Sequence, residues 1–186
     1  MTLKPLPAFS GLASGIVASL GMAALLALAA PVPGHAQADT GIAPVQADGG
    51  IVFTRMGFSL WLPENFGAPA FEQGDEISWL SPGLAETGKG IGVIFGAVPE
   101  RGIVLDGLGP DDEISRDSLT LNAQVFDRVH YQIPAEDVIG TFYLSQEAFH
   151  EGNFLAFMIA TQPDHWNAMR SLHDTIAERI ESLNSN

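Results

Sequence analysis

The last third of the chain carries the pattern that most constrains its fold. Residues 138–149 and 153–160 are rich in β-branched and aromatic residues, and Gly152 between them suits a tight turn. Apolar residues then recur at three- and four-residue steps, as on one face of a helix; they are Trp166, Met169, Leu172, Ile176, Ile180 and Leu183. The pattern predicts an antiparallel hairpin, followed by an amphipathic C-terminal helix that covers a sheet.

Shorter apolar runs earlier in the chain predict more strands. These runs are residues 51–55, 58–62, 76–81 and 90–98. Farther along, Pro110 and three acidic residues precede Ile114 and Leu119, as in the first turn of a helix, so we expect a short helix there. Together the elements predict an α+β fold, with helices packed on an antiparallel sheet as in an α/β/α sandwich.

Charge and cysteine content disfavour several functions. The chain has 22 acidic residues against 8 Lys and Arg, for a formal net charge of -14. This charge repels phosphate groups, so we expect neither nucleic acid nor an anionic membrane as a partner. Without cysteine there is no disulfide, thiolate metal site or cysteine nucleophile. We expect no cofactor, and a partner held by charge would be basic.

The N-terminal residues have the pattern of a secretory signal peptide. Lys4 precedes an apolar run over residues 11–30, Pro31 ends the run, and Ala36 and Ala38 form a signal peptidase site. An uncleaved anchor is the alternative, but the glycines and serines of the run lower its hydrophobicity. We expect cleavage after Ala38, export to a periplasm or beyond, and no stable membrane anchor. The expected organisation is a signal peptide at residues 1–38, a flexible leader at 39–50 and a single α+β domain at 51–186.

Two motifs suggest ligands but have plainer explanations. Residues 83–90 match a phosphate-binding loop except at Gly90, where Ser or Thr should bind magnesium, and a strand rather than a helix should follow. We therefore interpret them as a loop with Lys89 in solvent. An acidic segment could bind calcium, although it lacks the ligand spacing and the glycine of a calcium hand. Its candidate ligands are Asp106, Asp111, Asp112, Glu113 and Asp117.

No catalytic motif of the nucleophile-elbow or zinc-protease type occurs in the sequence. His165 and His173 are two turns apart on the C-terminal helix, too far to share a metal ion, and we expect both at its solvated edge. One alternative function is a metal- or acid–base-dependent hydrolase, with its site assembled from His130, His150 and carboxylates. A second is a carrier of a small apolar ligand. Its cavity would be lined by Phe95, Phe126, Phe142 and Phe157.

Trp61 and Trp79 are the candidate binding residues. In its strand, Trp61 lies on the face opposite Phe58 and Leu60. If those two residues are in the core, Trp61 faces outward, where a tryptophan can mark a binding surface. The alternative is that a second layer buries it on the other face of the sheet.

The domain opens with the sequence GFSLWLP at residues 57–63 and closes with the hairpin and helix. This order resembles the PsbP/DcrB-like family, whose members begin with a G-[FY]-x-[FI]-x-x-P strand and end with a helix similar to residues 176–183. Leu60 departs from that opening pattern. The resemblance implies an α/β/α sandwich and a non-catalytic accessory protein that acts through protein contacts. We therefore expect a secreted or periplasmic binding module whose partner is another envelope protein.

Overall fold

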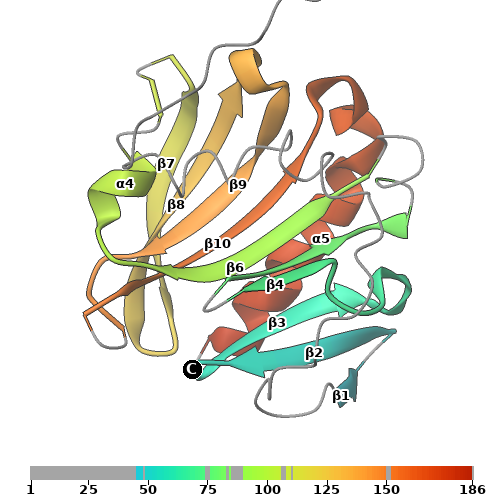
Figure 1. Cartoon of the computed structure of the whole chain (residues 1–186), viewed down its shortest axis with the longest axis horizontal. Helices are drawn as coiled ribbons and strands as arrows, with labels where there is room; N and C mark the ends of the chain where they lie inside the picture. The colour runs from blue at the N-terminus through green and yellow to red at the C-terminus, as the bar shows by residue number, and fades with distance from the viewer. Residues whose placement is uncertain are drawn as a thin grey trace, which may run out of the picture.

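The computed structural model describes part of the chain (Figure 1). The described residues are 45–47, 49–73, 76–82, 84, 90–105, 108–109, 111–149 and 152–185. The predicted signal peptide at residues 1–38 and most of the loop at residues 83–90 lie outside them. None of the helices in these ranges combines the length and the apolar character that a membrane span requires.

The described residues form ten strands in two antiparallel sheets. The smaller sheet has the order β1-β2-β3, and its strands are β1 (Val45–Ala47), β2 (Gly50–Arg55) and β3 (Phe58–Pro63). The larger sheet has the order β4-β5-β6-β10-β9-β8-β7. Its strands are β4 (Phe71–Gln73), β5 (Glu76–Leu80), β6 (Gly92–Val98), β7 (Glu113–Leu121), β8 (Gln124–Ile133), β9 (Val138–Ser145) and β10 (Phe154–Thr161). The four early strands predicted from apolar runs are confirmed.

The predicted hairpin and helix are also present. Strands β9 and β10 pair antiparallel, and Gly152 before β10 has a φ of +83°. Strand β9 ends at Ser145, earlier than predicted, where the serine hydroxyl donates to the carbonyl of Glu147 and accepts from the amide of Leu155. After β10 a short 3-10 helix, η3 (Pro163–His165), leads into α5 (Trp166–Asn184).

Helix α5 covers one face of the large sheet and lies behind it in Figure 1. Ile176 and Ile180 of the helix are fully buried in the same core as Phe58 of β3. Aromatic rings fill this core: the Phe58 and Phe157 centroids are 5.1 Å apart, and the Tyr143 and Phe157 rings stack at 4.0 Å. Burial of these side chains is what holds α5 and the small sheet against the large one.

A second core lies on the other face of the large sheet. Helix α4 (Arg101–Leu105) packs on this face through Val104, next to the buried side chains of Val129, Leu144 and Met158. The two cores follow from the alternation of side chains along the central strands. An α+β fold with an antiparallel sheet and a helix on each face is therefore confirmed.

Two tight turns place hairpins at the same end of the molecule. The β2–β3 turn has positive φ at Met56 (53°) and Gly57 (74°), and the β7–β8 turn has positive φ at Asn122 (48°) and Ala123 (60°). Two consecutive positive φ angles are typical of the two-residue turns that match strand twist. Met56 and Ala123 are less suited than Gly57 and Asn122, because the Cβ of an ordinary L-residue is strained in this conformation.

Two sequence predictions differ from the structure. The helix expected after Pro110 is wrong: residues 113–121 form β7, which pairs with β8 along its length apart from an irregularity between Glu113 and Ser115. As an edge strand, β7 is mostly exposed and lacks the apolar alternation that marks a strand. Part of the expected leader is also in the sheet, because residues 45–47 pair with β2.

Candidate functional site

Arg128 of β8 lies at the centre of a charged cluster that joins β7, β8, β9 and α5. Its guanidinium holds Asp117 of β7 through two hydrogen bonds, Nε to Oδ1 at 2.9 Å and Nη2 to Oδ2 at 2.5 Å. Its Nη1 pairs with Glu181 of α5 at 3.0 Å, and Tyr143 of β9 donates its hydroxyl to the same carboxylate at 2.7 Å. Hydrogen bonding to Arg128 lowers the pKa of Asp117, and burial raises the pKa of Tyr143. These four side chains connect three strands to the helix.

Histidines lie between α5 and the same sheet face. His130 of β8 shares a 2.8 Å hydrogen bond with the buried Thr141 of β9. His173 of α5 is 2% exposed, and its Nδ1 lies 3.0 Å from Asp174. The Trp166 ring meets His173 edge-on, with centroids 5.0 Å apart. Burial lowers the pKa of His173, which keeps the ring neutral at neutral pH. The expected position of His173 at a solvated edge is therefore wrong.

Asn184 ties the end of α5 to β3 and to the β7–β8 turn. Its side-chain oxygen accepts from the amide of Ser59 at 3.0 Å, and its side-chain nitrogen donates to the Ser59 carbonyl at 2.7 Å. The side-chain nitrogen of Asn122 donates to the side-chain oxygen of Asn184 at 2.9 Å and to the Gly57 carbonyl at 2.8 Å. The Asn122 amide also donates to the Asn184 carbonyl at 2.6 Å. Asn184 thus completes the backbone pairing of β3 as a neighbouring strand would.

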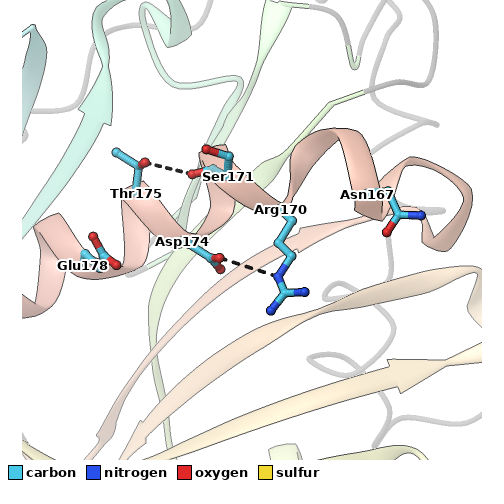
Figure 2. A pocket seen from close by; sticks show the side chains of 6 residues that line it. All are labelled: Asn167, Arg170, Ser171, Asp174, Thr175 and Glu178. Atoms are coloured by element: carbon cyan, nitrogen blue, oxygen red, sulfur yellow. Dashed lines mark hydrogen bonds and ion pairs between the residues drawn. The ribbon is translucent and has the colours of Figure 1, made fainter.

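The outer face of α5 has an open polar depression (Figure 2). It is lined by Asn167, Arg170, Ser171, Asp174, Thr175 and Glu178, which recur at three- and four-residue steps along one side of the helix. Arg170 Nε lies 3.7 Å from Asp174 Oδ2, and the Thr175 hydroxyl donates to the Ser171 carbonyl at 2.8 Å. The dashed lines in Figure 2 join residues of the same helix, so these contacts stabilise α5 itself.

The structure gives the candidate calcium ligands separate environments. Asp106 lies outside the described residues, and Asp111 is exposed. Asp112 accepts a backbone hydrogen bond at 2.7 Å, while Glu113 and Asp117 are each paired with an arginine at 2.5 Å. Over the described ranges, no three His, Asp or Glu side chains are placed to hold a metal ion. The structure does not bring the four described candidates together as a metal-binding group.

The two candidate binding tryptophans are both buried. Trp61 is 7% exposed, with its ring over Gly50 and the Arg179 guanidinium 5.7 Å from its centroid. Trp79 is 1% exposed and packs against Phe53 with centroids 5.0 Å apart. Of the two alternatives for Trp61, burial under a second layer is therefore the one observed. Neither ring presents an exposed face to a partner in this conformation.

The phenylalanines proposed to line a ligand cavity belong to two different cores. Phe95, Phe126 and Phe157 surround Phe58 at centroid distances of 5.1 to 6.0 Å, which is direct ring packing. Phe142 lies in the core on the opposite face of the sheet. These four residues therefore do not line one cavity. His150, part of the alternative hydrolase site, lies outside the described residues, so its proximity to His130 stays a prediction.

Five arginines of the described residues are paired with carboxylates of the same chain, and the sixth, Arg179, lies over the Trp61 ring. The pairs are Arg55 with Glu72, Arg101 with Asp127, Arg116 with Glu113, Arg128 with Asp117 and Glu181, and Arg170 with Asp174. Other exposed carboxylates form no ion pair with a Lys, Arg or His in the same ranges. They are Glu64, Glu100, Asp111, Asp137, Glu147, Asp164 and Glu178. Within the described residues, the acidic excess therefore lies on exposed carboxylates that form no ion pair.

Sequence reasoning missed the polar residues that hold α5. Asn184 and His173 lie on the same helical stripe as Ile176 and Ile180, at steps of three and four residues. A polar residue on an apolar stripe is buried with it, and then it needs a hydrogen-bonding partner. That signal was available in the sequence. The positions of Tyr143 and Arg128 opposite Glu181 follow only from the sheet register.

Comparison with known proteins gives limited similarity. No family model matches the chain, and no curated protein does. Among solved structures, the fold is similar to CyanoP, the cyanobacterial PsbP of Synechocystis sp. PCC 6803. That likeness has 19% identity and a TM-score of 0.43, and covers 79% of this chain and 97% of CyanoP. PA94 of Pseudomonas aeruginosa, a protein of unknown function, has 10% identity and a TM-score of 0.40, with 69% and 93% covered. These likenesses concern the course of the chain and assign no role to a residue.

Proposed function

We propose that the chain is a non-catalytic accessory module, exported to a periplasm or beyond, that binds a basic envelope protein. The observation that carries this proposal is the distribution of charge. Five arginines are paired with carboxylates of the same chain, while exposed carboxylates such as Asp164 and Glu178 form no ion pair within the described ranges. The resulting negative field attracts a basic surface and speeds its encounter with the module.

The use of the interior polar groups supports a scaffold rather than a reactive site. Tyr143 and Glu181 join β9 to α5, and Asn184 joins α5 to β3. His130 is hydrogen-bonded to Thr141 on the neighbouring strand. Each of these groups forms a hydrogen bond between two elements. Such contacts favour a rigid domain that binds a partner through its surface.

The test is capture of partners from an envelope extract by the chain from residue 39 onward, at low and at high salt. We expect a basic protein to be retained at about 50 mM salt and released near 500 mM, where the screening length falls to a few ångströms. If the same protein is captured equally at both salt concentrations, binding through charge is contradicted. Turnover of a substrate by the purified protein would contradict the non-catalytic role.

Two variants with equal changes of net charge sharpen the test. The first changes Asp137→Asn, Asp164→Asn and Glu178→Gln; the second changes Glu64→Gln, Glu100→Gln and Glu147→Gln. All six groups are exposed, so both variants should fold. We expect one variant to lose the captured protein more than the other, because direct contacts depend on position whereas net charge does not. If both variants still retain the captured protein at every salt concentration, the proposal is refuted.

A further inference from the structure

Helix α5 is held in different ways along its length. Its second half is fixed by directed polar contacts, since Glu181 binds Arg128 and Tyr143, and Asn184 binds the backbone of Ser59. Its first half carries the buried His173, with Trp166 against the imidazole ring. Both halves pack apolar side chains on the same core, including Met169 and Leu172 in the first, but within the described residues the directed polar contacts to the strands come from the second half.

The environment of His173 suits a neutral ring and opposes a charged one. Its Nδ1 already lies 3.0 Å from Asp174, and its Nε2 is buried with no hydrogen-bonding partner among the described residues. A protonated imidazole has an N–H at both nitrogens, so the second N–H would be buried without an acceptor. Burying a charge without full pairing costs several times more than burying a neutral polar group.

The charged groups around His173 come from two elements. On α5 itself, Asp174 favours protonation and Arg170 opposes it; on β8, which faces the helix, a charged His130 opposes it. Asp174 is half exposed, which screens its attraction. Thr141 on β9 carries no charge and is bonded to His130. Burial is the largest influence, and it lowers the pKa of His173.

We propose that the first half of α5, residues 166–174, is an acid-released latch: protonation of His173 lifts this half from the sheet while residues 176–184 stay attached. The inference does not rest on the proposed function. Opening moves the imidazole into water, where the charged form is solvated, so the open state binds a proton that the closed state excludes. The Trp166 ring and the sheet surface around Thr141 then become accessible, which gives this face two states.

Hydrogen exchange of the full chain between pH 7.5 and pH 5 tests the latch, after correction for intrinsic exchange rates. We expect protection of residues 166–174 to fall by up to about tenfold per pH unit once the pH is below the usual pKa of histidine near 6.5, as for release linked to one proton. Protection of residues 176–184 should not change. Equal loss along the whole helix, or no loss in its first half, would overturn the proposal.

Variants separate the latch from a general acid effect. We expect His173→Leu to keep residues 166–174 protected at pH 5, whereas the matched control His165→Gln, which removes a histidine just before α5, should still open. Opening of His173→Leu at pH 5 would refute the role of this side chain. If His173→Leu does not fold, the imidazole titration of His173 in the wild-type chain replaces it: opening must follow that titration, and opening at a different pH refutes the proposal.

Discussion

Replacing Asn184 with alanine should destabilise the domain far more than its position near the end of α5 suggests. The change removes the side-chain contacts to the Ser59 amide, the Ser59 carbonyl and the Asn122 side chain. Each net hydrogen bond is worth about 1 kcal/mol, and the partly buried Ser59 groups would lose their partners. We therefore expect the free energy of unfolding to fall by about 2 to 4 kcal/mol.

Urea denaturation followed by circular dichroism measures this loss. The matched control is Asn167→Ala, the same substitution at an exposed asparagine near the other end of the same helix. We expect the control to alter stability by less than about 0.5 kcal/mol. A loss for Asn184→Ala below about 1 kcal/mol, or no larger than that of the control, would refute the argument that Asn184 holds β3.

Three further predictions concern local contacts. Ala123→Gly should raise the free energy of unfolding by about 0.5 to 1 kcal/mol in urea titrations, because glycine relieves the strained turn; destabilisation would contradict this. Gly50→Ala should lower the melting temperature and shift tryptophan fluorescence, since a Cβ there would lie 2.3 Å from the Trp61 ring; unchanged spectra would show that the ring does not pack there. Because the pKa of Tyr143 is raised in the folded state, its phenol contributes stability below pH 10 that is lost as the pH rises further. Tyr143→Phe should therefore lose less stability than the wild-type chain in thermal melts between pH 9 and 11. An equal loss in the variant and the wild type would exclude Tyr143 as its source.

Elements with a clear hydrophobic period were predictable from the sequence. Ile176 and Ile180 set the buried face of α5, and the alternation of Phe58 and Leu60 marked β3. The segment of β7 was predicted as a helix because Pro110 and the acidic residues after it suit the first turn of a helix. Its conformation is decided by pairing with β8, which gives Asp117 its partner Arg128, and a local pattern cannot show that pairing.

The candidate sites depended on contacts that sequence spacing does not contain. Trp61 could face either solvent or a second layer, and only the packing of Gly50 and Arg179 against it decides for burial. The phenylalanines were assigned to one cavity, whereas strand register sends Phe142 to the opposite face from Phe157. Polar residues on the apolar stripe of α5 were the signal that was present but unused.

The contact between Ser59 and Asn184 joins residues separated by 125 positions. During synthesis the β2–β3 hairpin therefore emerges long before the helix that completes it. Until α5 arrives, the hairpin exposes Phe58, Leu60 and the unpaired backbone of Ser59, which are features that promote aggregation. Contacts this distant also slow folding. Holding the chain unfolded until α5 has been synthesised would therefore suit this topology. A chaperone bound to the β2–β3 hairpin would protect the segment whose partner is made last.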